Sequence, residues 1–181
     1  MMTIAWKKII KSWLKAALIA ALFTVIIRNF IFLPISVSGS SMIPTITESD
    51  QLIIETISST ERFDIVVFRD QFGRPLIKRV IGLPGESIRY EDDQLFINDK
   101  RVEESFLKNK LVDKAGGLWT SNFTLKELTG NDTIPESEYF VMGDNRRLSN
   151  DSRYFGSIKA DSIIGEVLMV YYPFKQVRII Q

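Results

Sequence analysis

Ser41, within the segment Ser41–Thr45, and Lys78, which precedes Arg79, are the residues whose types could support nucleophilic catalysis in this chain of 181 residues. A serine hydroxyl is a weak nucleophile at neutral pH unless a base lies beside it. The chain contains no histidine and no cysteine. A Ser-His-Asp triad, a thiol protease and a metal site built on histidine or cysteine are therefore excluded. If nucleophilic attack occurs here, a lysine amine must be the base.

Lys78 lies in an apolar stretch, from Leu76 to Ile81, that predicts a β-strand. Side chains alternate along a strand, so Leu76, Lys78 and Val80 share one face while Arg79 points to the other. Burial between apolar neighbours disfavours the ammonium and would lower the pKa of Lys78 from about 10.4. The alternative is an ordinary dibasic pair, charged and solvated at a strand edge. This stretch alone does not decide between the two.

Ser41 stands in a segment crowded with serines, which also include Ser36, Ser38 and Ser40. Such a segment could be no more than a polar linker. Gly39 permits a close backbone approach, but physical reasoning does not choose between Ser40 and Ser41 as the nucleophile.

A third polar cluster spans Gly143–Arg153. Standing alone, it is typical of a hydrated loop rich in turn-forming residues. Its functional interpretation is a scaffold of charge-assisted hydrogen bonds beside an active site.

The first forty residues carry five basic residues and no acidic one, whereas all 22 acidic residues lie further along the chain. From Ala16 to Leu33 the only charged residue is Arg28. As a helix this stretch would rise about 27 Å, close to the thickness of a bilayer's hydrocarbon core. The positive-inside rule places the basic segment 1–15 in the cytoplasm and the remainder outside. We therefore predict a single-pass transmembrane anchor over 16–34, in contact with the lipids of the cytoplasmic membrane.

Two alternatives to a retained anchor are open. The flanking lysines disfavour a buried helix of a soluble domain. A cleavable export signal would place the small residues Ser36 and Ser38 before a cleavage site at Gly39. The apolar stretch is longer than a usual signal core, which favours retention. The mildly acidic remainder of the chain argues against a nucleic-acid partner.

Beyond residue 34 the periodicity is mostly that of strands, without internal repeats. Pro84 followed by Gly85 favours a type II turn, and the segment 91–93 favours a hairpin. We predict one extracytoplasmic, β-rich catalytic domain over 35–181, with an inserted flap over 101–134. The fold class is therefore mainly β, preceded by one N-terminal transmembrane helix. The expected strands are 35–38, 65–68, 76–81, 87–90, 94–97, 138–142 and 164–172.

Four segments, in this order, closely resemble the motifs of bacterial type I signal peptidases: 39–45, 62–68, 78–86 and 143–153. One predicted anchor and a short middle insertion make the chain more similar to the enzymes of Gram-positive bacteria than to larger two-anchor forms. The resemblance implies a mainly β catalytic domain that needs no metal or cofactor. Its exposed strands would bind the cleavage region of a secretory preprotein in extended form, as an added strand.

The resemblance also implies roles for individual residues. Ser41, directly before Met-x-Pro-Thr, would be the nucleophile, and Lys78 would be the general base. Ser149 would orient the lysine amine. Asp151 with Arg153 and Asp144 with Arg79 would form supporting ion pairs. The substrate site would be shaped by Met42, Ile77 and Gly39, of which Met42 and Ile77 would lie beside a small pocket for the substrate's P1 alanine.

The chain departs from the family pattern at three positions. Some members carry a serine in place of Gly39, and its hydroxyl supplements the oxyanion hole; here that hole would rest on backbone N–H groups. Phe63 replaces the glycine of an Arg-Gly-Asp sequence, and Glu86 stands where aspartate is often found. None of these changes removes a catalytic group.

The function implied is that of a membrane-anchored serine endopeptidase that cleaves N-terminal signal peptides from exported preproteins after small residues. The alternative is a non-catalytic relative that assists the assembly of surface proteins or pili, which would be expected to lack the serine or the lysine. Whether Leu118 and Trp119 touch the membrane is open. We expect Trp119→Ala to weaken activity more on a membrane-embedded substrate than on a soluble peptide.

Overall fold

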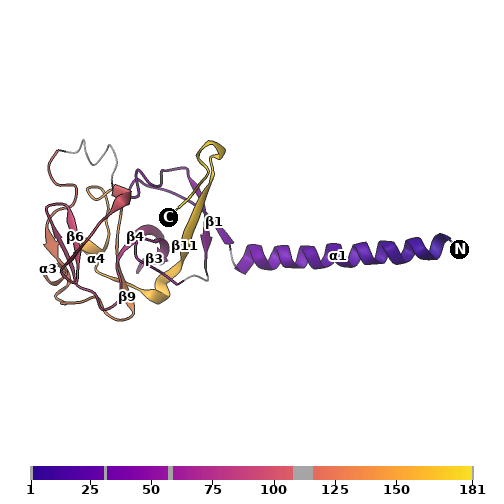
Figure 1. Ribbon diagram of the computed structural model, residues 1–181, viewed down its shortest axis with the longest axis horizontal. Helices are drawn as coiled ribbons and strands as arrows, with labels where there is room; N and C mark the ends of the chain where they lie inside the picture. Colours follow the sequence, from indigo (N-terminus) through magenta and orange to yellow (C-terminus); the bar gives the residue numbers. More distant parts are fainter. Residues whose placement is uncertain (1, 31, 57–58, 108–115, 181) are drawn as a thin grey trace. The chain divides into compact units, whose positions relative to one another are not determined.

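The computed structural model describes residues 2–30, 32–56, 59–107 and 116–180, and the chain divides into two compact units, Met1–Leu33 and Pro34–Gln181. The first unit contains helix α1 (Met2–Phe30), which takes in both the basic segment and most of the apolar stretch (Figure 1). Within the described ranges, no helix combines the length and the apolar character that crossing a membrane requires.

The second unit is built on two β-sheets (Figure 1). The larger sheet has the strand order β1-β2-β11-β3-β4-β9-β10, with β12 also paired to β11, and the smaller has the order β7-β6-β5-β8. The strands are β1 (Phe32–Ser36), β2 (Gln51–Glu55), β3 (Ile65–Arg69), β4 (Pro75–Gly82), β5 (Ile88–Glu91), β6 (Gln94–Ile97), β7 (Lys100–Val102), β8 (Phe123–Thr124), β9 (Glu138–Met142), β10 (Ile158–Lys159), β11 (Ile163–Tyr172) and β12 (Arg178–Ile179). The short helices of this unit are η1 (Ser105–Leu107), α3 (Leu125–Thr129), α4 (Ser152–Phe155), η2 (Ala160–Ser162) and η3 (Phe174–Gln176).

The mainly β fold class is confirmed, and the predicted strands 65–68, 76–81 and 138–142 agree with β3, β4 and β9 to within a residue at each end. At the β5–β6 turn, Asp92 and Asp93 have φ of 49° and 60°, as a two-residue hairpin loop of type I′ requires. The Pro84-Gly85 turn also forms, since Gly85 has φ 77° and the Glu86 N–H donates to Leu83 O at 3.2 Å.

Other elements differ from the prediction. The first strand is 32–36 instead of 35–38, and β2 was not predicted. Within the predicted flap, β7, β8 and α3 are formed, and both strands belong to the smaller sheet. The part of the flap from 108 to 115 lies outside the described residues.

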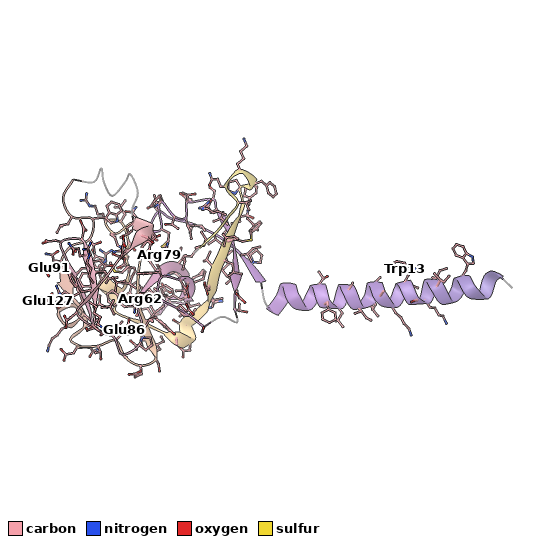
Figure 2. The ribbon with its side chains drawn as sticks, viewed as in Figure 1. Trp13, Arg62, Arg79, Glu86, Glu91 and Glu127 are labelled. Carbon is pink, nitrogen blue, oxygen red and sulfur yellow. The ribbon has the colours of Figure 1, made fainter. Side chains whose placement is uncertain are left out.

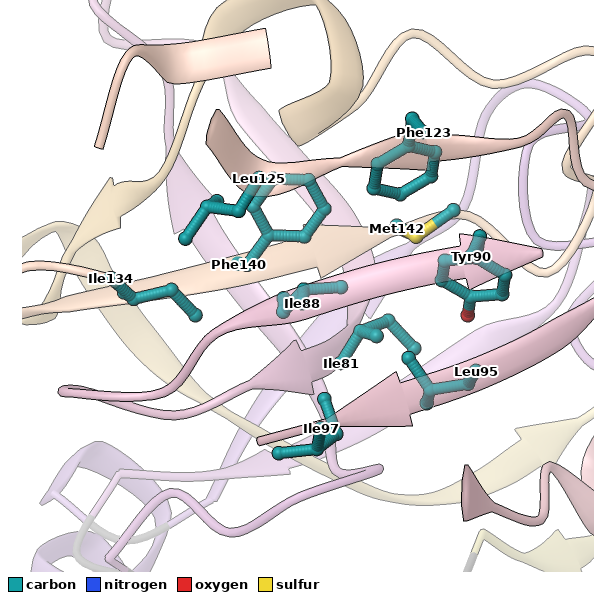
Figure 3. Close-up of a cluster of buried hydrophobic side chains, with 10 residues drawn as sticks. All are labelled: Ile81, Ile88, Tyr90, Leu95, Ile97, Phe123, Leu125, Ile134, Phe140 and Met142. Carbon is teal, nitrogen blue, oxygen red and sulfur yellow. The ribbon is translucent and has the colours of Figure 1, made fainter. Parts of the chain in front are cut away.

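Two apolar clusters cover the two faces of β4 and β9. One lies between the sheets, where Ile81 and Met142 meet side chains of β5, β6 and β8 (Figure 3). The other contains Val80 and Val141, together with Val66 and Phe68 of β3. Because successive side chains on a strand point to opposite faces, each residue of β4 is directed into one of two buried environments. This alternation determines the surroundings of Lys78 and Arg79.

Candidate active site

Ser41 and Lys78 are brought into contact from two distant parts of the chain. Ser41 begins the turn that follows the β1 segment, and Lys78 lies near the middle of β4, paired with Val66 of β3. Lys78 Nζ donates a hydrogen bond to Ser41 Oγ at 2.8 Å and another to the Ile77 carbonyl at 3.1 Å. Thus Ser41, and not the neighbouring exposed Ser40, presents its hydroxyl to a lysine.

The environment of Lys78 favours its neutral form. Its side chain is only 4% exposed, and the flanking Leu76 and Val80 belong to the same apolar cluster. Burial lowers the pKa of Lys78 below its ordinary value, and the negative charges of Asp151 and Asp144 offset this only in part. The alternative of a solvated dibasic pair at a strand edge is therefore wrong.

Gly143 and Asn145, at the start of the loop 143–153, hold the backbone of the serine segment. The Asn145 N–H donates to Ser41 O at 3.0 Å, and Asn145 Nδ2 donates to Ser40 O at 3.1 Å. A Cβ atom on Gly143 would lie 2.5 Å from Ser41 O, so only glycine allows this approach. Sequence reasoning assigned no role to either residue, although both begin the recognised polar cluster.

Ser149 Oγ is buried and has no hydrogen-bond partner among the described residues. The two hydrogen bonds of Lys78 Nζ go to other acceptors. The role of Ser149 in orienting the amine therefore stays a prediction.

Arg79 and Asp144 form a buried, bidentate ion pair on the opposite face of β4. Arg79 Nε and Nη2 donate to the two carboxylate oxygens of Asp144 at 2.9 and 2.8 Å, and both side chains are 1% exposed. Arg79 Nη1 donates to Phe63 O at 2.7 Å, and Thr45 Oγ1 donates to Asp144 Oδ2 at 2.5 Å. This one pair thereby joins all four segments that the resemblance singled out.

Two further ion pairs stabilise the same segments. Arg153 donates to both carboxylate oxygens of Asp151 at 2.8 Å, and Asp151 in turn accepts from the Gly143 N–H at 3.0 Å. Arg62 pairs with Glu86 at 2.5 Å and donates to Ile81 O at 2.7 Å; Figure 2 shows this pair together with Arg79.

A pocket of about 970 Å³ has Ser41 and Lys78 in its wall. Phe68, Leu76 and other residues of the β3–β4 hairpin line one part of it, and Ser38 and residues of the segment 150–162, such as Phe155 and Lys159, line the remainder. Of the residues predicted to bind substrate, Met42 is buried, Ile77 is half-buried, and neither lines this pocket.

Gly39, the third residue predicted to bind substrate, is exposed and has φ 92°, a conformation that favours glycine. A Cβ atom built on it would meet nothing within 4 Å. A larger residue here would be limited by the backbone conformation and not by space.

Trp119 does not lie at the surface. It is 9% exposed, and its Nε1 donates to Asp144 O at 3.1 Å. Its backbone N–H donates to Asp93 Oδ2 at 2.9 Å. The burial of Trp119 removes the ground for its expected preferential role on membrane-embedded substrates, because the indole contacts the loop 143–153 from inside. Leu118 remains 43% exposed.

A serine in hydrogen-bond contact with a buried lysine, within a mainly β domain, defines a class of serine peptidase that works without histidine. Comparison with known proteins specifies the family. The family described as signal peptidase, peptidase S26, matches residues 10–172, and this chain belongs to it as a bacterial type I signal peptidase. The chain is thus a serine endopeptidase.

Curated relatives and a solved structure agree with this assignment. The chain is 43% identical to signal peptidase I V of Bacillus subtilis over 159 residues, which is 86% of this chain and 95% of that protein. It is 34% identical to signal peptidase IB of Staphylococcus aureus over 178 residues, 94% of this chain and 93% of that protein. A crystal structure of a signal peptidase I from Enterococcus faecalis is 43% identical and has a TM-score of 0.55, covering 61% of this chain and 97% of the other.

Proposed function

We propose that this chain removes N-terminal signal peptides from exported preproteins, with Ser41 and Lys78 as its catalytic dyad. The observation that carries the proposal is the 2.8 Å hydrogen bond between a buried lysine amine and Ser41 Oγ. The names of the relatives support the substrate, because these proteins are signal peptidases. The presence of both the serine and the lysine disfavours the alternative of a non-catalytic assembly factor.

In the proposed mechanism, the neutral Lys78 amine accepts the Ser41 hydroxyl proton as Oγ attacks the scissile carbonyl carbon. Backbone N–H groups, including that of Ser41, stabilise the resulting oxyanion. The lysine ammonium then gives its proton to the leaving amine as the peptide C–N bond breaks, which leaves an acyl ester on Ser41. A water molecule transfers a proton to Lys78 and attacks this ester, and proton return to Ser41 releases the signal peptide.

The supporting residues keep this pair in register. Asp144 and Arg79 connect β4 to the loop 143–153, and Asp151 with Arg153 stabilises that loop internally. Ser149 would accept or donate a hydrogen bond as the lysine amine changes protonation. Substrate would lie in extended form along the strands, with Met42, Ile77 and Gly39 close to its P1 and P3 side chains. Shallow apolar pockets would reject large residues there.

The test is cleavage of a preprotein with an Ala-x-Ala site by the full chain in detergent. Ser41→Ala and Lys78→Ala are each expected to lose activity while remaining folded, whereas the matched control Ser40→Ala keeps it. A folded wild-type chain that cleaves nothing would favour the assembly factor. Activity that survives Ser41→Ala would contradict the site assignment.

We further propose that the segment 16–34 anchors the enzyme in the cytoplasmic membrane, with the catalytic domain outside. The apolar run in the sequence and the basic residues before it support this topology. The described large apolar side chains of α1, such as Trp13, are exposed (Figure 2). Alkaline extraction is expected to leave the full chain in the membrane pellet, with the catalytic domain digested only by protease added outside. Release into the supernatant would contradict the anchor.

A further inference from the structure

The pocket that contains Ser41 and Lys78 is also lined by other basic residues. Besides Lys78, its charged lining residues are Arg69, Arg74, Lys159 and Asp70. Apart from Lys78, three cations and one carboxylate therefore line the pocket.

The one carboxylate is already engaged. Asp70 Oδ2 accepts from Arg74 at 2.7 and 2.8 Å, and Asp70 Oδ1 accepts from the Phe72 and Arg74 N–H groups at 2.9 Å. Asp70 thus closes the β3–β4 turn and compensates the charge of Arg74. No acidic lining residue is left for the other two cations.

Arg69 and Lys159 have no ion-pair partner among the described residues. Arg69 Nη1 donates to the backbone carbonyl of Gly73 at 3.2 Å, which leaves its charge uncompensated. Lys159 lies on β10 opposite Glu138 of β9, but that carboxylate accepts a hydrogen bond from Ser157 and does not line the pocket. Both side chains are exposed and free to meet a ligand.

The offset along β4 between Lys78 and the level of Arg69 suits a bound peptide. Arg69 pairs with Pro75 across the β3–β4 hairpin, and Pro75 is three residues before Lys78 on β4. A strand advances about 3.4 Å per residue, so Arg69 lies level with a point roughly 10 Å from Lys78 along β4, which corresponds to about three residues of a bound strand.

We propose that Arg69 and Lys159 form a subsite for an acidic side chain of the preprotein, on the side of the scissile bond that lies over the β3–β4 turn. The inference rests on the proposed function, since it assumes that the pocket holds the cleavage region. A solvent-exposed ion pair is worth little, so the preference for Glu over Gln is about two- to fivefold. It decreases with salt, because exposed charges are screened over about 8 Å at physiological ionic strength.

The experiment uses the full chain in detergent and a series of peptides from one preprotein, in which a single Glu or Gln is moved through the cleavage region. The wild type is compared with Arg69→Gln/Lys159→Gln. The control Lys100→Gln/Lys175→Gln removes the same charge at exposed residues outside the pocket. We expect a Glu preference in kcat/KM at positions on one side of the bond only. It is lost in the first variant, retained in the control and abolished by about 0.5 M salt.

A Glu-to-Gln ratio near one at every position, or a preference unchanged in Arg69→Gln/Lys159→Gln, would overturn the subsite. Binding of the same peptides to Ser41→Ala, measured by fluorescence anisotropy, separates this inference from the proposed function. Glu-dependent binding that requires Arg69 and Lys159, without cleavage of any peptide by the wild type, would support the subsite and contradict the peptidase mechanism.

Discussion

Lys78 and Arg79 are neighbours on β4 and both are buried, yet their surroundings have opposite effects on a positive charge. Arg79 has a bidentate carboxylate and a backbone carbonyl as partners, so its charge is compensated. Among the described residues, the hydrogen bonds of Lys78 go to a hydroxyl and a carbonyl, and the carboxylates of Asp144 and Asp151 act on it without an ion pair. One face of the strand therefore stabilises a cation, while the other destabilises one.

This difference separates a structural role from a chemical one. A compensated cation is held in one protonation state and serves as a connector between segments. An uncompensated, desolvated amine gives up its proton more readily and becomes a base. The desolvation that would suit Lys78 to the proposed catalysis makes it unfavourable for folding, a cost that active sites commonly carry.

The largest effect expected is that of Lys78→Met on activity. Methionine keeps the volume of the lysine stem but removes the base, so kcat/KM should fall by about 10²–10⁴-fold. The melting temperature should stay the same or rise, because folding no longer has to desolvate a lysine amine at the expense of its proton. Peptide cleavage and thermal unfolding measured at the same pH check both parts. A clear fall in melting temperature would show that the lysine stabilises the fold.

Arg79→Met, the matched change one residue along, should have the opposite signature. It leaves Asp144 buried and unpaired, which costs about 3–5 kcal/mol in the free energy of unfolding. Urea unfolding measures this loss. The double change Arg79→Met/Asp144→Leu should recover part of it, since no charge is then left buried. Equal stability of Lys78→Met and Arg79→Met would contradict the contrast between the two faces.

Much of this contrast could be predicted from the sequence. The alternation of residues 76–81 placed Lys78 and Arg79 on opposite faces, but the stretch alone did not decide whether Lys78 is buried between Leu76 and Val80 or solvated at a strand edge. The pairing of Arg79 with Asp144, 65 positions further along, came only from family resemblance. No local pattern specifies which distant carboxylate will meet a given arginine.

Trp119 shows why the rest could not be predicted. A tryptophan after Gly116-Gly117 in a polar segment has the composition of an exposed loop, and the sequence leaves open whether it touches the membrane. Its burial depends on Asp93 in the β5–β6 turn and on Asp144 in the loop 143–153. For the same reason, the contacts of Asn145 and Gly143 with the Ser41 backbone could not be predicted, because they depend on a segment about 100 residues earlier in the chain.

Trp119→Ala should therefore destabilise the enzyme by about 3 kcal/mol, as large-to-small changes at buried aromatic residues do. It also leaves Asp144 O without its donor. Cleavage of a membrane-embedded preprotein and of a soluble peptide should decrease by the same factor, measured below the melting temperature of the variant. A selective loss on the embedded substrate would restore a membrane role for this loop.

The pH dependence of the wild type tests the state of Lys78 directly. Its pKa is lowered by burial, so kcat/KM should rise about tenfold per pH unit on the acid side and level off below the ordinary lysine pKa of about 10.4. Stability should follow the same direction. Between the folded and unfolded pKa values the unfolded chain binds more protons, so the free energy of unfolding rises with pH in that window. If kcat/KM still rose above a pH of about 10.4, the ordinary lysine pKa, Lys78 would be excluded as the base.

Ser149→Ala should have the smallest effect on stability, within about 1 kcal/mol, because its buried hydroxyl has no hydrogen-bond partner among the described residues. Turnover should nevertheless fall, and the acid limb of the pH profile should move, if Ser149 orients the Lys78 amine during the reaction. Ser152→Ala is the matched control. Ser152 Oγ accepts from the Val141 N–H at 2.9 Å, so its loss should destabilise by about 1–3 kcal/mol and leave the pH profile in place. Wild-type turnover and an unchanged pH profile in Ser149→Ala would contradict the role of Ser149 in orienting the Lys78 amine.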